Sequence, residues 1–311
     1  MTALRQDFLD AYDAMLGRWP VSVDSVDIPG RLGTTHVNMC GAADGPAVVL
    51  LHGGGATSTV WYGVVGDLVE HHRVYAIDAI GDLGRSIYNG APIGGAAGLV
   101  AWLDEVLDAV HVTDVAAIAG HSYGAWVAMR YTLHAPDRVR RLVLLDPTEC
   151  FIPVSLRYKL RAIPLMVRGS TDSYRSFYRW ETRGRPLDSQ WFELAMTKSG
   201  GKSGLVWPKR PSSAQLHQMR TPTLVFVANR SRQQSAKRLA SVARRTLARV
   251  EIEAVPEASH FTLPTVHAPE IGAAMARFLL SAAAPPAANV ASGPDTDARE
   301  TESDAQEKSQ A

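Results

Sequence analysis

The sequence of 311 residues contains only two cysteines, Cys40 and Cys150. Neither belongs to a CxxC or Cys/His pattern with metal-ligand spacing, which argues against a structural zinc site. Two isolated cysteines are typical of a protein from a reducing compartment, where we expect both to be partly buried free thiols.

The sequence also lacks an excess of charge of one sign and any long hydrophobic run. Its 32 basic and 31 acidic side chains give a net charge of +1, which argues against a global attraction to nucleic acid or to an anionic membrane. No stretch approaches the roughly 20 apolar residues that span a bilayer. Residues 1–16 carry charged side chains instead of the apolar run of a signal peptide. We therefore expect a soluble, cytoplasmic protein with no nucleic-acid or membrane partner.

The small net charge results from a cancellation between segments. Residues 150–220 hold 13 basic and 4 acidic side chains, whereas residues 1–149 hold 9 and 17, and residues 282–311 hold 2 and 6. A basic segment can steer an anionic substrate or an acidic carrier protein towards a site. It can equally pair with acidic groups of the same chain.

What the sequence does contain is a regular alternation of short apolar runs and helical patterns. Short apolar runs suit strands that are buried on both faces of a parallel sheet, and their alternation with helices predicts an α/β fold. An amphipathic helix within residues 4–16 and an antiparallel strand pair at 21–28 and 34–39 precede this pattern. The predicted parallel strands are Ala47–Leu51, Val74–Ile77, Val115–Ala119, Leu142–Leu145, Thr223–Val227 and Val250–Ala254, and the predicted helices are Val60–His71, Gly95–Val110, Tyr123–His134, Arg232–Leu247 and Pro269–Leu280.

Two segments interrupt this rhythm. Residues 150–220 are aromatic and basic and separate two predicted strands, so we expect a helical cap that lies over one end of the sheet. Residues 282–311 have no periodicity and almost no large apolar side chains, which predicts a disordered acidic tail. The remaining residues, 1–149 and 221–281, form the predicted α/β core.

The strongest chemical signal is the pentapeptide from Gly120 to Gly124, with the sequence GHSYG. It follows an apolar strand and precedes a helix, and a sharp turn between such elements leaves the hydroxyl of Ser122 projecting freely. The two glycines allow strand and helix backbones to approach closely. The helix N-terminus adds positive potential where a negative tetrahedral intermediate would form. We interpret Ser122 as a nucleophile.

A second glycine-rich turn, His52-Gly53-Gly54-Gly55, follows the first parallel strand. Acyl transfer needs backbone N–H groups that point at the developing oxyanion. We assign one donor to Gly54 and the other to Tyr123, the residue after the nucleophile. No Lys-Ser/Thr pair follows the glycines, so a phosphate-binding loop is poorly supported. We interpret His52 as structural.

These motifs resemble those of the α/β-hydrolase superfamily, and more closely those of bacterial carboxylesterases with a G-x-S-x-G nucleophile elbow. The resemblance extends from about residue 21 to residue 280 and is weak in the insertion. It implies an α/β-hydrolase fold, in which a mostly parallel central sheet is flanked by helices and carries a helical cap. The stretches that carry it are HGGGATSTVWY (52–62), YAIDAIGDLGRS (75–86), AGHSYGAWVAMRY (119–131), LDPTECFIP (145–153), PTLVFVANR (222–230) and ASHFTLPTVHAPEI (258–271).

The resemblance also points to the base. A serine hydroxyl needs a base to become a nucleophile at neutral pH, and histidine suits this role by its pKa. His260 follows the last predicted strand, at the position where α/β hydrolases carry the base, so we assign it this role.

The acid of the triad departs from the family pattern. Related hydrolases carry it on the loop after the strand Thr223–Val227, but that loop, residues 228–234, contains no carboxylate. We favour Asp146, at the end of the preceding strand, which is an alternative location in this superfamily. Glu149 on the same loop is the second candidate, and a dyad in which Asn229 or Ser231 holds His260 weakly is the third.

The predicted function is therefore that of a serine hydrolase that cleaves a carboxylic ester through a Ser122 acyl-enzyme, without metal or organic cofactor. The expected partner is a small ester-like substrate, including anionic or carrier-bound ones. Lactone, thioester, amide and carbon–carbon bond cleavage would use the same residues. The missing carboxylate after Val227 keeps two other classes open: a non-hydrolytic cyclase or lyase, and a ligand-binding pseudo-hydrolase.

Overall fold

The structure is a computed structural model that describes residues 3–168, 170–197 and 204–281. Its strands form one sheet in the order β1-β2-β4-β3-β6-β7-β8-β9, and β5 (Ile87–Tyr88) pairs with β2. The pairs β1–β2, β2–β4 and β2–β5 are antiparallel, and the remaining pairs are parallel. The strands of the main path are β1 (Asp24–Gly30), β2 (Gly33–Cys40), β3 (Ala47–Leu51), β4 (Arg73–Ile77), β6 (Val115–His121), β7 (Leu142–Leu145), β8 (Thr223–Ala228) and β9 (Val250–Val255).

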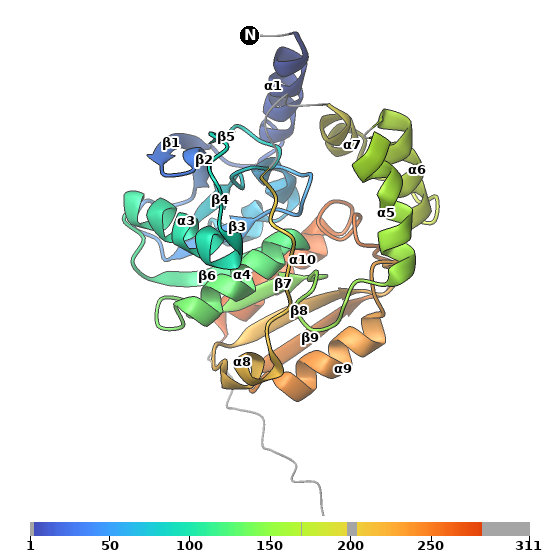
Figure 1. Ribbon diagram of the computed structural model, residues 1–311. Coiled ribbons are helices and arrows are strands. Elements are labelled where there is room, and N and C mark those ends of the chain that lie inside the picture. The colour runs from blue at the N-terminus through green and yellow to red at the C-terminus, as the bar shows by residue number, and fades with distance from the viewer. Residues whose placement is uncertain (1–2, 169, 198–203, 282–311) are drawn as a thin grey trace, which may run out of the picture.

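Helices cover both faces of this sheet (Figure 1). The side chains of α3 (Gly95–Ala109), α4 (Tyr123–His134) and α9 (Ala236–Thr246) join one apolar core. A second core contains side chains of α1 (Ala3–Leu16), the 3-10 helix η1 (Ser58–Gly63), α2 (Val65–Leu68) and α10 (Ala268–Leu280). Because both faces are covered, β3, β7 and β8 are buried along their whole length, which is why their sequences are continuously apolar.

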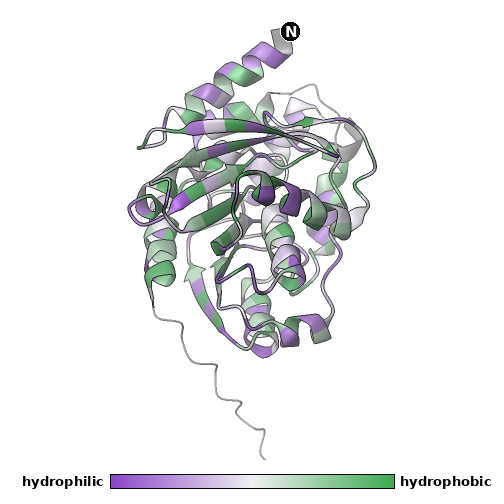
Figure 2. Cartoon of the chain, turned by 90° about the vertical axis from the view of Figure 1, so that its left-hand side faces the viewer, coloured by the Kyte–Doolittle hydropathy of each residue, from purple (hydrophilic) through white to green (hydrophobic). Residues whose placement is uncertain are grey.

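The first helix shows how amphipathic spacing places an element on the sheet. Phe8, Tyr12 and Met15 recur at helical spacing and are fully buried, while hydrophilic and hydrophobic residues alternate along α1 in Figure 2. The Tyr12 hydroxyl donates a hydrogen bond of 3.0 Å to the buried carboxylate of Asp78, at the end of β4. The helix is therefore fastened to the carboxyl edge of the sheet.

The insertion, residues 150–220, combines helices with irregular segments in its described parts, and residues 204–212 are one such irregular segment. It contains α5 (Leu156–Arg168), α6 (Thr171–Glu181), α7 (Ser189–Met196) and α8 (Ser213–Gln218) between β7 and β8. Arg18, just after α1, forms an ion pair of 2.7 Å with Asp188, which caps the N-terminus of α7. The Tyr62 hydroxyl donates a second hydrogen bond to Asp188 at 3.1 Å. Polar contacts thus fasten the insertion to the core.

Two elements differ from the sequence prediction. The single helix expected over Val60–His71 is instead η1 followed by the short α2. Gly63 and Gly66 disfavour a continuous helix, and a side chain at Gly63 would meet the Cβ of Ala268 at 2.6 Å, so η1 packs too closely on α10 for a larger residue. The pairing of β5 with β2 was not predicted. No helix in the described ranges is long and apolar enough to cross a membrane, and the predicted tail, residues 282–311, lies outside those ranges.

Candidate active site

Ser122 lies at the sharp connection between β6 and α4 with φ 53° and ψ −110°, a backbone conformation that is rare for a non-glycine residue. The two flanking glycines make this turn possible. A Cβ at Gly124 would overlap the carbonyl oxygens of Leu51 and His52, and one at Gly120 would overlap the backbone of Gly124. Backbone crowding at the crossing of β3, β6 and α4 therefore explains why both positions are glycine.

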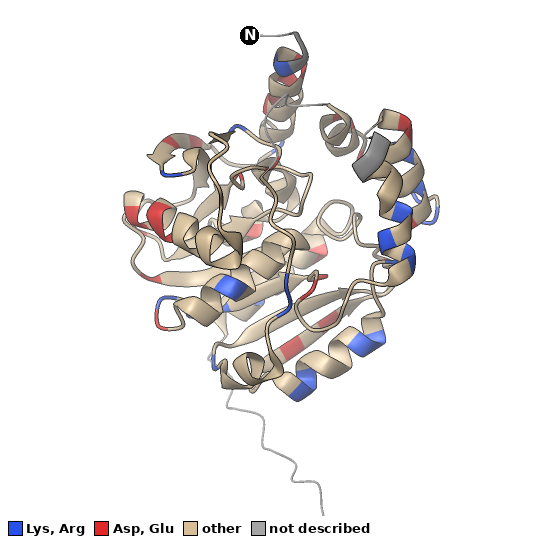
Figure 3. Cartoon of the chain, in the orientation of Figure 1, with Lys and Arg blue, Asp and Glu red and all other residues tan. Residues whose placement is uncertain are grey.

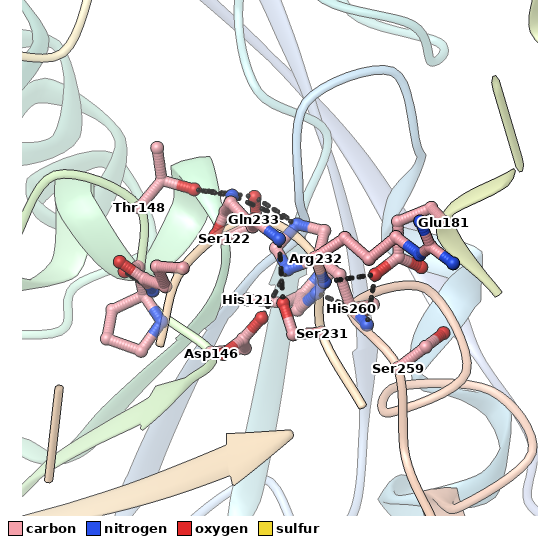
Figure 4. Close-up of polar contacts among 12 residues, drawn as sticks. His121, Ser122, Asp146, Thr148, Glu181, Ser231, Arg232, Gln233, Ser259 and His260 are labelled. Atoms are coloured by element: carbon pink, nitrogen blue, oxygen red, sulfur yellow. Dashed lines mark hydrogen bonds and ion pairs between the residues drawn. The ribbon is translucent and has the colours of Figure 1, made fainter. Parts of the chain in front are cut away.

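Three side chains from three separate loops form a hydrogen-bonded row at this turn (Figure 4). Ser122 Oγ lies 2.8 Å from His260 Nε2, and His260 Nδ1 lies 2.6 Å from Asp146 Oδ2. All three residues are buried. Because a carboxylate only accepts hydrogen bonds, Nδ1 carries the proton, and Nε2 is left to accept the Ser122 hydroxyl hydrogen. This is the tautomer in which histidine acts as a base towards serine.

Of the three other residues proposed as partners of His260, Asn229 is exposed, and Glu149 and Ser231 take part in other hydrogen bonds. Glu149 accepts the backbone N–H of Val154 at 3.1 Å and forms ion pairs with Lys159 at 3.3 Å and Arg210 at 3.7 Å. Ser231 Oγ accepts the backbone N–H of Gln233 at 3.2 Å. Of the sequence candidates for the acid, the structure therefore brings Asp146 to His260 and directs Glu149 towards basic residues of the insertion.

Gln233 and Thr148 join this row although the sequence analysis did not select them. Thr148 Oγ1 lies 3.0 Å from Ser122 Oγ, and the Gln233 amide nitrogen donates to Thr148 Oγ1 at 2.6 Å. The same nitrogen lies 3.4 Å from His260 Nε2. Gln233 occupies the loop after β8, where related hydrolases carry the acid. Its place on that loop is the one sequence signal that could have pointed to it.

Glu181, the last residue of α6, is a third residue near the site that sequence reasoning missed. Its side chain is fully buried, and Oε1 accepts the backbone N–H of His260 at 3.0 Å and that of Arg232 at 3.3 Å. These bonds join the insertion to the loops that follow β8 and β9. A glutamate in a polar helix has no local feature that reveals such a contact, because its partner is 79 residues away in sequence.

His121 contacts the loop that carries His260. Burial, together with the nearby imidazole of His260, lowers the pKa of His121 well below its usual value. Its Nε2 lies 3.0 Å from the backbone carbonyl oxygen of His260, so the neutral ring donates its proton there. His121 thus holds the backbone of His260.

The glycine-rich turn is held by His52. Its Nε2 accepts the backbone N–H of Ala79 at 3.0 Å, so its Nδ1 carries the proton that is donated to the Gly53 carbonyl oxygen at 2.8 Å. In a trans peptide the N–H of Gly54 points opposite to that carbonyl, away from His52. His52, which the sequence analysis interprets as structural, therefore orients one predicted oxyanion donor, the N–H of Gly54.

The two predicted donors, Gly54 and Tyr123, both line the same cavity as Ser122. A Cβ at Gly54 would lie 3.7 Å from that of Tyr123, so the two backbones are neighbours. Asp82, which also lines the cavity, accepts the backbone N–H of Gly55 at 3.0 Å. Burial raises the pKa of the Asp82 carboxyl above its usual value.

The cavity above Ser122 has a volume of about 740 Å³. One wall comes from the core loops, and the opposite wall comes from α5, α6 and α7. Its acidic and basic lining side chains, apart from His260, are Asp82, Glu149 and Lys159, and Lys159 is paired with Glu149. The aromatic lining residues are Tyr123, Tyr158, Tyr174, Phe177, Tyr178, Trp207 and Phe261.

No group of three or more His, Cys, Asp or Glu side chains suited to a metal ion occurs in the described ranges. Cys40 and Cys150 are both buried free thiols, and burial raises the pKa of Cys40 to about 12.

Comparisons with known proteins agree on one family. A model described as the alpha/beta hydrolase family matches residues 48–274. Carboxylesterase YbfK of Bacillus subtilis (strain 168) is 34% identical over 176 residues, which are 56% of this chain and 57% of that protein. The uncharacterized carboxylesterase nap of the same organism is 32% identical over 167 residues, 54% of this chain and 55% of that protein. These alignments span little more than half the length of the relatives.

A solved structure extends the likeness to nearly the whole described chain. The crystal structure of naproxen esterase (carboxylesterase NP) from Bacillus subtilis superposes with a TM-score of 0.81 at 25% identity. The superposition covers 89% of this chain and 99% of that one. The insertion and the sheet therefore share an overall arrangement with that protein.

Proposed function

We propose that this chain, which belongs to the alpha/beta hydrolase family, is a hydrolase that cleaves carboxylic esters through an acyl-enzyme on Ser122. The predicted fold class, an α/β-hydrolase fold with a mostly parallel sheet flanked by helices, is confirmed. The observation that carries the proposed activity is the buried row of Ser122, His260 and Asp146 at the base of a cavity.

In the acylation step, Ser122 Oγ attacks the carbonyl carbon of the ester while its proton passes to His260 Nε2. The carboxylate of Asp146, 2.6 Å from Nδ1, stabilises the imidazolium that forms. The backbone N–H groups of Gly54 and Tyr123 stabilise the negative charge on the former carbonyl oxygen by donating hydrogen bonds to it. The tetrahedral intermediate then breaks its bond to the alcohol oxygen, which takes the proton from Nε2.

Deacylation repeats these steps with water as the nucleophile. His260 Nε2 takes a proton from the water as its oxygen bonds to the acyl carbon, and the proton then returns to Ser122 Oγ as the acyl–enzyme bond breaks. Each proton taken by His260 is returned, so the cycle needs no metal or redox partner.

The lining of the cavity supports an uncharged, bulky substrate. Aromatic rings from the insertion and from Phe261 dominate its walls, and the basic group of Lys159 is occupied by Glu149. A volume of about 740 Å³ lies within the range of pockets that hold drug-sized ligands. One structural relative is a naproxen esterase, and naproxen is an aryl-substituted alkanoic acid. An ester with an aryl-containing acyl group is our proposed substrate class for this chain. In this view residues 150–220 are a cap that roofs the pocket.

The non-hydrolytic alternatives rested on the absence of a carboxylate from the loop after β8. The contact between Asp146 and His260 supplies a carboxylate from the neighbouring strand instead. This contact favours the hydrolase over a cyclase, a lyase or a binding protein.

A fluorophosphonate probe with a reporter group tests the proposal. We expect stoichiometric labelling of the wild-type chain, loss of labelling in Ser122→Ala, and loss of turnover of p-nitrophenyl butyrate in both Ser122→Ala and His260→Ala. Labelling elsewhere in the chain, or full turnover by Ser122→Ala, would overturn the nucleophile and with it the acyl-enzyme mechanism.

A further inference from the structure

The helix α5 carries an apolar row on its outer side that neither the core nor the cavity uses. Leu156, Leu160 and Ile163 are 70%, 57% and 47% exposed. Spacings of four and three residues place them on one side of the helix. The side chains of Tyr158 and Ala162, between them in sequence, line the cavity on the other side. The same helix therefore presents one apolar face to the pocket and another to solvent.

Basic side chains lie next to this row, on α5 itself and on the adjacent α6. Arg157 and Arg161 of α5 are exposed, as are Arg175 and Arg179 on the adjacent α6. In Figure 3 these helices carry several blue segments among the tan ones. Within the described ranges, none of the four has an ion pair: Arg157 stacks over the ring of Trp180, and Arg161 donates to the hydroxyl of Ser176. The outer surface of α5 and α6 thus combines exposed aliphatic groups with unneutralised positive charge.

Two other apolar side chains of the insertion line the cavity and also meet solvent. Leu205 and Trp207 line the cavity and yet are 44% and 64% exposed. Trp is favoured at the boundary between water and hydrocarbon because its ring is apolar and its N–H is polar. Exposed apolar groups therefore border the opening of the pocket as well as the outside of α5.

We propose that the outer face of α5, with the arginines of α5 and α6, binds an anionic phospholipid surface. An amphipathic helix with basic flanks lies in the membrane–water interface with its apolar side chains in the acyl region and its cations near the headgroup phosphates. The whole-chain charge of +1 hid this possibility, because acidic residues elsewhere cancel the local excess.

The charge pattern favours lipid over protein partners. A second copy docked on the same face would bring the arginines of α5 against their own counterparts, since a two-fold interface pairs identical patches. An acidic protein would neutralise the arginines but would need a matching apolar surface for the aliphatic row, whereas lipid hydrocarbon adapts to it. Binding to lipid stands independently of the enzymatic activity. Delivery of membrane-dissolved esters to the cavity rests on the proposed function.

Co-sedimentation of the full chain with sucrose-loaded vesicles tests the binding. We expect binding to phosphatidylcholine vesicles that contain phosphatidylglycerol, little binding to phosphatidylcholine alone, and weakening by salt. The triple variant L156S/L160S/I163S and the double variant R157Q/R161Q should each lower the partition coefficient by about tenfold or more. The matched control is I87S, which removes a side chain of 57% exposure on β5, outside α5 and α6. It should bind as the wild type does.

Several results would overturn the proposal. These are absence of binding to anionic vesicles, equal loss in I87S and in the triple variant, or binding of polyglutamate without binding of vesicles, which would indicate an acidic protein partner. A dimer by light scattering that the triple variant abolishes would instead identify an interface between copies. Turnover of soluble p-nitrophenyl butyrate should be unchanged in the triple variant. Its absence from the wild type would overturn the esterase function alone, because vesicle binding is measured without substrate.

Discussion

Replacement of Asp146 by asparagine tests the least expected member of the active-site row. Asp146 Oδ2 accepts the proton of His260 Nδ1 at 2.6 Å. An asparagine amide in this place can donate to Nδ1, which moves the ring proton to Nε2, where it blocks acceptance of the Ser122 hydroxyl. Loss of the correct tautomer lowers catalysis by about 10⁴-fold in serine triads. That factor corresponds to about 5.5 kcal/mol of transition-state stabilisation. Because the two side chains are nearly isosteric, we expect the fold to survive.

The assay is kcat/KM with p-nitrophenyl butyrate, together with the rate of fluorophosphonate labelling. Glu149→Gln is the matched control, since Glu149 is a carboxylate three residues away that pairs with Lys159 and Arg210. We expect it to lower kcat/KM by less than about tenfold. An Asp146→Asn enzyme within tenfold of the wild type, with Glu149→Gln the more damaged variant, would refute the assignment. Urea unfolding midpoints of both variants separate a catalytic loss from a folding defect.

Three further predictions concern the supports of the site. Glu181→Ala removes the acceptor of the His260 backbone N–H and should cost about 1.5–3 kcal/mol of stability and slow fluorophosphonate labelling, whereas Glu181→Gln keeps an acceptor oxygen and should retain most of both. Equal urea midpoints and labelling rates for Glu181→Ala and the wild type would contradict this role. His121 has a lowered pKa in the folded state, so the unfolded chain binds the extra proton first as the pH falls, and stability should decrease below about pH 6.5 by at most about 1.4 kcal/mol per pH unit from this group. His121→Asn should show a shallower dependence in urea unfolding at pH 7 and pH 5, and an identical slope would refute it. Gly124→Ala would drive a Cβ into the carbonyl oxygen of Leu51 and should destabilise the chain by about 3 kcal/mol, which a normal thermal unfolding midpoint would contradict.

The strands were predictable from sequence because their environment is uniform. β3, β7 and β8 are covered on both faces, so nearly every position is apolar and the predicted runs match the strands to within one residue. The helix expected after β3 was less predictable. Its hydrophobic spacing persists, but glycines and the close approach of α10 divide it into η1 and α2. The hydrophobic spacing of a segment indicates which of its sides is buried. It does not indicate how closely a neighbouring element, here α10, packs against it.

In the candidate site, too, some residues could be predicted from the sequence and others could not. Ser122 stands in a local motif, because a strained turn needs its glycines. His260 was selected from its position after the last strand, through the resemblance to α/β hydrolases. The choice between Asp146 and Glu149, three residues apart on one loop, has no local signal. It depends on the direction of each side chain, and Asp146 and Glu149 both have positive φ, which turns that loop sharply. The contact of Glu181 could not be predicted from local sequence either, since its partner, His260, belongs to a distant loop.

By itself, the sequence determined the order of strands and helices, the turn that exposes Ser122, and the segment that interrupts the sheet. It did so because these features depend on neighbours close in the chain: hydrophobic period, glycine at a crowded turn, and apolar runs. Only the tertiary structure decided which carboxylate reaches His260, that Glu181 of the insertion holds its backbone, and which side of α5 meets solvent. The contact of Glu181 with His260 joins residues 79 positions apart, and that of Asp146 with His260 joins residues 114 positions apart. Such distances are closed by the packing of the sheet and the insertion, and no local pattern encodes them.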